Sequence, residues 1–305
     1  MDFNDYENSS AGVSPAELFY FQHHTLAWAL TSADEPITVS GVTCEPCDIS
    51  RTEATSTQEL NKANVNITLP RDHPVVQLHS LYPPSHVTTV TVYRTHRDDP
   101  DLQFTVVWMG RVLNVEGAGV MATLHCEPVA TSIRRIGLRQ MYQRQCPHVL
   151  YSPNTCKVDR ELFKVNGTFV ALDEDTHLMM TVGFNPSTLP AKMWDRVGSV
   201  DVPLIEDKLS GGMVGWVSPT GLTYWRSILY QAAAVGSQVG IQINFPIPLL
   251  DIEGSPSLPV GSALVLFPGC QHTMTNCLNT FNNLPNYGGY PYIPLLNPFN
   301  GTTLY

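Results

Sequence analysis

The chain has 305 residues, which is enough for two domains with separate cores, and only 14% of its residues are charged. Its 24 prolines and 21 glycines, together with a low usage of lysine and glutamate, disfavour a helical protein and favour a β-rich one with many turns. The formal net charge of −10 argues against a protein that grips nucleic acid, because phosphate binding needs a basic surface. We therefore expect no sequence-specific nucleic-acid binding.

The N-terminal residues carry no recognisable targeting signal. The stretch MDFNDYENSS lacks the basic start and the apolar core of a secretory leader. No apolar run approaches the roughly 20 residues that span a bilayer, so no membrane partner is expected. In a reducing cytoplasm the seven cysteines are expected to be thiols or metal ligands rather than disulfides.

A helix is predicted from Pro15 to Leu30. Ser14 can cap this helix, Pro15 suits its first position, and Glu17 completes a capping box. His23 and His24 fall within it as surface or partly buried residues. Because adjacent helical positions point about 100° apart, the two rings are not expected to share a metal ion.

Residues 35–126 are predicted to form an antiparallel β unit, since short runs there alternate or stay apolar between turn-forming residues. The segment 131–143 is predicted to be a short basic helix or turn that leads to Cys146. Its positive side chains form either a face exposed to solvent or a contact surface. In the second case they would contact an acidic neighbouring subunit or the negative charge of a thiolate-ligated cluster. These side chains are Arg134, Arg135 and Arg139, together with Arg144 directly after the segment.

The strand pattern returns after Cys156, and a second β-rich block runs from Gly211 to Gly269. A β-rich body of about residues 160–266 therefore leaves from one cysteine loop and returns to another. We predict a mainly β protein with two domains. Residues 1–135 form an antiparallel β domain with one helix, and residues 136–305 form a second β-rich domain closed at its base by a four-cysteine metal cluster.

The candidate ligands lie in two turn-rich loops and are Cys146, Cys156, Cys270 and Cys277. Soft thiolates select zinc, copper(I) or iron–sulfur clusters, and a tetrahedral four-sulfur site holds zinc or an iron–sulfur cluster. Nine residues separate the first pair and six the second, which fits neither zinc ribbons nor the common ferredoxin patterns. The spacing of the cysteines alone does not decide whether they bind zinc or an iron–sulfur cluster. His148 and His272 could each replace a thiolate at zinc, or could, like Asn276 and Asn282, donate hydrogen bonds nearby.

Three other motifs are interpreted as structural. The CxxC pair Cys44 and Cys47 lies between strand-like runs and is followed by a poor helix start, unlike a redox motif. Cys126 is expected to be a small buried hydrophobe at a strand end. The stretch from Gly117 to Ala122 fits a dinucleotide-binding pattern on paper. A strand rather than a helix follows it, so we predict a hairpin turn.

The C-terminal run has a distinctive order of residues: Gly269-Cys270, Cys277, Phe281, Asn286-Tyr287, Gly289, Pro291 and Pro294. This order resembles the C-terminal signature of the tail-tip hub proteins of long-tailed phages and gene transfer agents, a family similar to the lambda tail-tip protein L. The earlier cysteine loop, Gly211-Gly212 with Trp216, and the strand before Gly269 are also similar. The resemblance covers about residues 139–294 and is vague before them.

The resemblance implies a non-enzymatic structural component of a phage tail tip or baseplate hub, which forms a ring, expected to be a homotrimer, around the tail axis. It implies that Cys146, Cys156, Cys270 and Cys277 ligate a [4Fe–4S] cluster that braces the C-terminal region. The implied partners are copies of the chain itself, a distal tail ring protein, a central hub or fibre protein, and the end of the tape-measure protein. The implied location is a virion tail tip assembled in the host cytoplasm.

Two alternatives stay open. The first is a bacterial iron–sulfur redox protein, which would need a substrate pocket with catalytic groups, and no such constellation is found in the sequence. The second is a β module stabilised by zinc. The identity of the metal would separate it from the tail-hub hypothesis.

Overall fold

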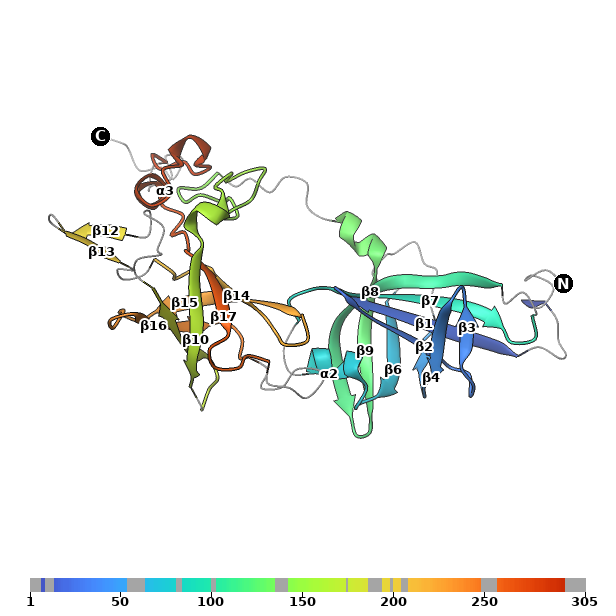
Figure 1. The fold of residues 1–305 in the computed structure, drawn as a ribbon. Helices are drawn as coiled ribbons and strands as arrows, with labels where there is room; N and C mark the ends of the chain where they lie inside the picture. The colour runs from blue at the N-terminus through green and yellow to red at the C-terminus, as the bar shows by residue number, and fades with distance from the viewer. Residues whose placement is uncertain are drawn as a thin grey trace. The chain divides into compact units, whose positions relative to one another are not determined.

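The computed structural model of the protein describes residues 7–8, 14–53, 64–80, 84–99, 103–134, 142–173, 175–185, 194–197, 200–203, 208–247 and 257–293. The chain divides into two compact units, here called unit 1 (residues 1–136 and 252–254) and unit 2 (residues 137–251 and 255–305). Both units consist mainly of strands, as Figure 1 shows. The expectation of a mainly β protein is confirmed.

The described part of unit 1 contains one large sheet with the strand order β3-β4-β2-β1-β7-β8-β9-β6-β5. Neighbouring strands pair antiparallel except β2 and β4, which pair parallel. Helix α2 (Pro74–Ser80) adds the buried side chains of Val75 and Val76 to the core of this sheet. The strands are β1 (Pro15–His23), β2 (Leu26–Thr31), β3 (Ile37–Val39), β4 (Val42–Pro46), β5 (Ser50–Arg51), β6 (Val65–Pro70), β7 (Thr88–His96), β8 (Phe104–Ala118) and β9 (Met121–Pro128).

The predicted helix from Pro15 to Leu30 is wrong, because this segment forms β1 and β2. Strand β1 lies between β2 and β7 and pairs with both along most of its length. Phe19 and Phe21 enter the main core from one face of β1, while Ala16 and Leu18 enter a smaller cluster from the other. An apolar run that is buried on both faces of a central strand does not alternate, so its periodicity is not that of an amphipathic strand.

The structural interpretation of the remaining unit 1 motifs holds. Strands β8 and β9 form a hairpin whose turn is Gly119-Val120, with Gly119 at a φ of 64°. Cys126 is buried within β9 and packs in the core. The thiols of Cys44 and Cys47 pack against different apolar clusters, so the CxxC pair does not form one site.

A short 3-10 helix, η2 (Val129–Arg134), follows β9 in the basic segment. Arg135 and Arg139 lie outside the described residues, as does the side chain of Arg134. Pro294 lies outside them as well. Arg144 is described, and its Nε donates to the carbonyl oxygen of Pro291 at 3.2 Å.

Unit 2 contains a closed six-stranded barrel with the strand order β10-β11-β16-β15-β14-β17. Alternate residues of its strands are buried, which is the pattern of a filled barrel interior. Strands β12 (Trp194–Val197) and β13 (Val200–Pro203) form a separate hairpin. The barrel strands are β10 (Val165–Leu172), β11 (Met179–Phe184), β14 (Met213–Val217), β15 (Thr223–Gln231), β16 (Gln238–Ile243) and β17 (Ala263–Phe267).

The described part of unit 2 also contains the short helices η3 (Arg160–Phe163), α3 (Met274–Asn279) and η6 (Leu284–Asn286). Helix α3 lies within the second of the two turn-rich cysteine loops. The side chain of Thr273 caps α3 by accepting a hydrogen bond from the backbone N–H of Asn276. None of the described helices has the length and apolar character that crossing a membrane requires.

Candidate metal centre

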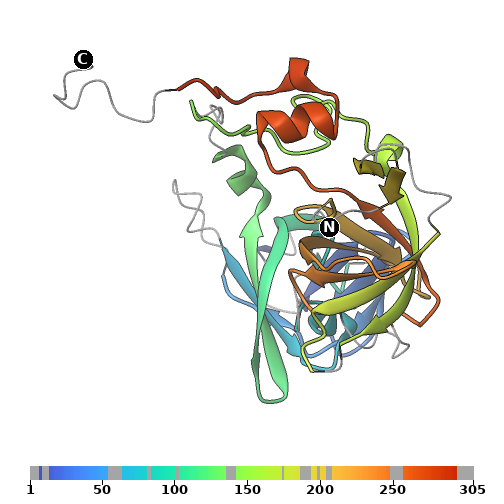
Figure 2. The same ribbon diagram turned by 90° about the vertical axis from the view of Figure 1, so that its left-hand side faces the viewer.

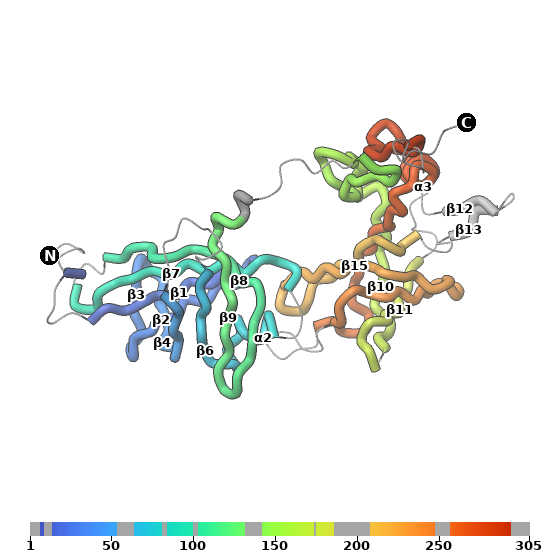
Figure 3. The backbone as a smooth tube through the Cα atoms, turned by 180° about the vertical axis from the view of Figure 1, so that it is seen from behind, coloured from blue at the N-terminus to red at the C-terminus, as the bar shows by residue number. Residues whose placement is uncertain are grey.

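The two cysteine loops meet because of how the barrel closes. Strands β10 and β17 pair antiparallel, with Val165 opposite Leu266. The segment that enters β10 and the segment that leaves β17 must therefore lie at the same end of the barrel. Figures 1, 2 and 3 show the result, in which the green chain before β10 runs beside the red chain of α3. Pairing within the barrel thus brings together cysteines that are far apart in the sequence.

All four candidate ligands line one cavity at this end of the barrel. Cys277 is buried and the other three thiols are half-buried. Val158, Phe163 and Phe281 form an apolar cluster against which Cys156 and Cys270 pack. The residues that line the cavity are Cys146, His148, Leu150, Cys156, Val158, Cys270, His272, Cys277, Phe281, Asn286 and Tyr287.

Hydrogen bonds to backbone groups tie the two loops to each other. The backbone N–H of Cys146 donates to the carbonyl oxygen of His272 at 2.9 Å, and His272 Nδ1 donates back to the carbonyl oxygen of Cys146 at 2.9 Å. His148 and His272 both bond to backbone groups, as the sequence-based alternative to metal ligation proposed. The other ties are Tyr290 N to Gln143 O, His148 Nδ1 to Asn286 O, Tyr287 Oη to Arg144 O, Tyr151 Oη to Pro268 O, and Asn283 Nδ2 to Cys156 O.

Glycines permit the close approach of the two loops. A Cβ atom on Gly288 would lie 2.4 Å from Nε2 of His148, and one on Gly289 would lie 2.5 Å from the carbonyl oxygen of Arg144. A Cβ atom on Gly269 would lie 1.8 Å from the carbonyl oxygen of Ser210. These distances are far below van der Waals contact, so the glycines of this region are a packing requirement of the site.

Three of the four sulfur atoms accept hydrogen bonds from nitrogen. The backbone N–H of His272 donates to Cys270 Sγ at 3.3 Å, and that of Gly288 donates to Cys146 Sγ at 3.4 Å. Asn283 Nδ2 lies 3.8 Å from Cys156 Sγ. The fourth sulfur behaves differently, because Cys277 Sγ donates to the carbonyl oxygen of Asn283 at 3.4 Å. Of these bonds, the one from His272 acts to lower the pKa of Cys270.

Burial and mutual repulsion oppose ionisation of Cys270 and Cys277. Burial raises the pKa of Cys277 to about 11, and the nearby Cys270, Cys156 and Cys146 add to the rise. The pKa of Cys270 is also raised, chiefly by burial, although the hydrogen bond from His272 acts in the opposite direction. Burial likewise raises the pKa of Tyr287. Closely spaced thiols of this kind release their protons when a cation binds to them.

The described residues contain no group of three or more His, Cys, Asp or Glu side chains that could hold a single metal ion. The four cysteines line the cavity without forming such a group. Sequence reasoning missed two polar contacts to sulfur, those of Asn283 and Gly288. It named Asn276 and Asn282 instead. Asn276 Oδ1 accepts from the backbone N–H of Gln271 at 3.3 Å, and the backbone N–H of Asn282 donates to the carbonyl oxygen of Leu278. An Asn or Gly in a turn looks alike whether or not its N–H reaches a sulfur, so spacing could not select them.

Two models of phage protein families match the chain. The family described as "Baseplate hub protein, N-terminal attachment domain" matches residues 22–159. The family described as "Phage conserved hypothetical protein BR0599" matches residues 209–296, which include β14 to β17 and the second cysteine loop. Together these matches support a structural component of a phage tail or baseplate as the class of this protein.

Individual proteins are similar as well. An uncharacterized protein of Xylella fastidiosa (strain 9a5c) is 26% identical over 187 residues, which cover 57% of this chain and 39% of that relative. The chain thus matches well under half the length of the curated relative. A chain in the solved structure titled "Virion of native gene transfer agent (GTA) particle" has a TM-score of 0.69 and 16% identity, over 99% of this chain and 97% of that chain. At that identity the match establishes a shared fold.

Proposed function

We propose that this protein is a structural component of a phage-type tail tip in which Cys146, Cys156, Cys270 and Cys277 hold a [4Fe–4S] cluster. The observation that supports the metal site is the convergence of two sequence-distant loops around one cavity lined by all four thiols. The role is non-catalytic: the site would brace the C-terminal region of the protein.

The residues at the cavity fit an iron–sulfur cluster by their chemistry. Four thiols are the usual ligand set of such a cluster, and N–H groups that donate to the ligating sulfurs are a usual part of its surroundings. Four iron–thiolate bonds would add covalent ties to the hydrogen bonds that already join the two loops. Zinc would require the four sulfurs to converge at about 2.3 Å from one centre. Analysis of the bound metal separates the zinc site from the cluster.

We further propose that copies of the chain form a ring around the tail axis, expected to be a trimer. Residues 1–135 would supply the ring contacts, and residues 136–305 would carry the cluster. The partners would be a distal tail ring protein, a central hub or fibre protein and the end of the tape-measure protein, with assembly in the host cytoplasm. The match of residues 22–159 to a hub attachment domain and the fold shared with a chain of a gene transfer agent particle support this placement.

The metal proposal is tested by assaying iron, zinc and acid-labile sulfide on protein purified without oxygen. We expect about four irons and four sulfides per chain. Cys270→Ser should lose both, while the matched control Cys47→Ser, whose thiol lies in unit 1, should keep both. A result of zinc without acid-labile sulfide would mean that the four cysteines hold zinc and not an iron–sulfur cluster. Protein free of metal, or equal loading of the Cys270→Ser variant, would refute the four-cysteine site.

The tail role is tested separately on intact particles. Antibody raised against this chain should label one end of purified tails in electron micrographs, and light scattering of the purified protein should give three copies per assembly. Labelling along the head or along the whole tail tube would contradict a tail-tip position. This outcome does not depend on the metal content, so the two proposals can fail independently.

A further inference from the structure

Four histidines of unit 1 gather where β1 ends and β7 begins. His23 is the last residue of β1 and lies opposite Thr88, the first residue of β7. His24 follows in the turn, His79 comes from α2, and His86 precedes β7. The rings of His24 and His86 lie 4.6 Å apart between centroids, and those of His23 and His86 lie 6.1 Å apart. Neither the fold nor the proposed metal site of unit 2 accounts for this cluster.

A single buried hydroxyl joins two of the rings. Thr88 Oγ1 lies 2.9 Å from His23 Nδ1 and 2.7 Å from His79 Nε2. Thr88 is fully buried and only 3% of His23 is exposed. A hydroxyl has one proton to donate, so it can donate to one neutral ring and accept from the other. We call His23, Thr88 and His79 the relay. When His23 Nδ1 and His79 Nε2 both carry a proton, the hydroxyl hydrogen of Thr88 has no acceptor within the relay.

The surroundings of the relay disfavour positive charge. The groups that act electrostatically on His23 are His86 and His24, and the group that acts on His79 is His23. His86 Nε2 is buried without a hydrogen-bond partner in the described part of the chain. Beside α2, His73 accepts a hydrogen bond from the backbone N–H of Val75, and Asp72 acts electrostatically on His73. A proton added to His23 or His79 would therefore lie buried among other imidazoles, with no carboxylate among the groups that act electrostatically on these two rings.

We propose that His23, Thr88 and His79 form an acid-sensitive latch that holds α2 on the sheet of unit 1. Protonation of the latch separates His79 from Thr88 and releases α2 from the core. The helix covers that core through Val75 and Val76, which are fully buried and pack in the same cluster as Phe19 and Phe21. Acid would thus expose an apolar surface that is closed at neutral pH.

The direction of the pH effect follows from the two pKa values. Burial lowers the pKa of both His23 and His79 to about 4, and neighbouring histidines contribute to each shift. An unfolded or released histidine titrates near its ordinary value of about 6.5. The latch therefore contributes its full stability above pH 6.5 and loses it progressively as the pH falls toward 4.

The test is amide hydrogen exchange of residues 75–80 in the full-length protein at pH 7.0 and pH 4.5, corrected for intrinsic exchange rates. Protection in α2 should fall by at least about tenfold at the lower pH. His79→Gln keeps a polar partner for Thr88 but does not titrate, so its α2 should lose much less protection. His125→Gln is the matched control, because His125 bonds to Asn66 and Glu116 away from α2 and should behave as the parent protein.

A second measurement keeps the proposal falsifiable if His79→Gln folds poorly. The ring resonances of the parent protein, titrated by NMR, should show two histidines that stay neutral well below pH 6. Titration of His23 and His79 between pH 6 and 7 would overturn the latch. Equal losses of α2 protection in the parent protein and in a His23→Gln/His79→Gln double variant would overturn it as well.

Discussion

His272 and Cys146 are joined by two reciprocal hydrogen bonds, each 2.9 Å long, although 125 positions separate them in the sequence. The Cys146 backbone N–H donates to the His272 carbonyl oxygen, and His272 Nδ1 donates to the Cys146 carbonyl oxygen. Because a carbonyl only accepts, the His272 ring must carry a proton on Nδ1. These two hydrogen bonds hold the two cysteine loops together without a bound metal.

The first prediction concerns this pair. His272 has a φ of 57°, a conformation that Asn adopts more readily than most residues, so His272→Asn removes the ring bond without adding backbone strain. We expect a loss of about 1 kcal/mol in the local stability of the two loops. Hydrogen exchange of residues 142–160 would measure it. Unchanged exchange would mean that the ring bond does not contribute to the tie.

The second prediction concerns the glycine that precedes Cys270. In Gly269→Ala the new Cβ would meet the backbone oxygen of Ser210, which cannot move aside as a flexible side chain can. We expect the variant to lose more than about 3 kcal/mol of unfolding free energy or to misfold. Gly240→Ala is the control in the same unit, since its Cβ would lie 3.4 Å from the Cβ of Ala232. Thermal unfolding of the two variants should separate them, and equal melting temperatures would contradict the packing argument.

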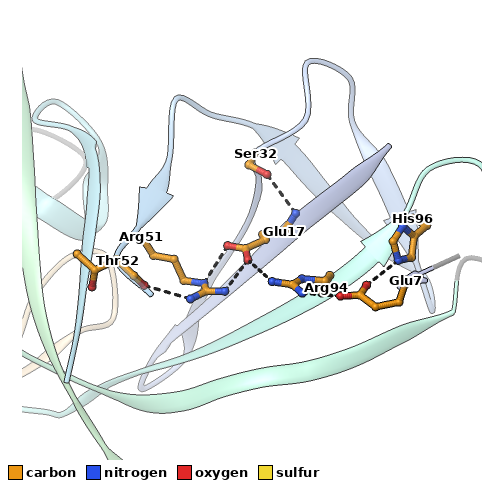
Figure 4. A network of polar contacts seen from close by, with 7 residues as sticks. All are labelled: Glu7, Glu17, Ser32, Arg51, Thr52, Arg94 and His96. Atoms are coloured by element: carbon orange, nitrogen blue, oxygen red, sulfur yellow. Dashed lines mark hydrogen bonds and ion pairs between the residues drawn. The ribbon is translucent and has the colours of Figure 1, made fainter. Parts of the chain in front are cut away.

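The third prediction concerns the charge network of unit 1 shown in Figure 4, in which Glu17 on β1 binds Arg51 through two hydrogen bonds of 2.6 and 2.9 Å. The side chain of Arg51 is only 9% exposed. Glu17→Gln would leave this guanidinium charge largely buried without its carboxylate, and we expect a loss of about 2 kcal/mol.

The matched control for Glu17 is Glu35→Gln. Glu35 binds Arg97 at 2.8 Å, but its side chain is 75% exposed, so its removal should cost less than about 0.5 kcal/mol. Urea unfolding of both variants would measure the difference. Similar losses of unfolding free energy in the two variants would show that the burial of Arg51 does not determine how much its pair with Glu17 stabilises the protein.

The fourth prediction concerns thiol reactivity near pH 8. Burial raises the pKa of Cys126 to about 12, and its side chain is 1% exposed, so an alkylating reagent should modify it only after unfolding. In metal-free protein Cys146, Cys156 and Cys270 should react sooner than the more buried Cys277. Loading with iron and sulfide should protect these four while leaving Cys47 unchanged. Mass spectrometry after timed alkylation would identify each site, and continued reaction of Cys156 after loading would argue against its role as a ligand.

The strand-rich character of the chain was predictable because it depends on composition and short-range pattern. In β6 and β9, for example, which begin at Val65 and Met121, buried and half-buried residues alternate along the strand. The segment from Pro15 to Leu30 was not predictable in this way. Its local capping signals favour a helix, but pairing with β7, whose partner residues begin at Thr88, places it at the centre of a sheet. Long-range pairing and burial on both faces overcame a local preference that contributes about 1 kcal/mol.

The candidate metal site was likewise predictable only in part. The four cysteines could be selected from the sequence because paired thiols in turn-rich loops need support other than an apolar core. Their neighbours could not be selected, since Asn283 and Gly288 reach sulfur only after β10 pairs with β17 and the loops approach. The histidine cluster of unit 1 was not predictable either, because His23 was assigned to a helix and it meets Thr88 only through the pairing of β1 with β7.

The sequence by itself determined the class of fold, the two turn-rich cysteine loops and the buried character of Cys126, because each depends on residue type and on neighbours within a few positions. Only the tertiary structure decided which strands are neighbours, which backbone groups reach the sulfurs and which histidines share a hydroxyl. The physical reason is that strand pairing joins residues across long stretches of chain, and the free energy of those contacts exists only after the chain has closed.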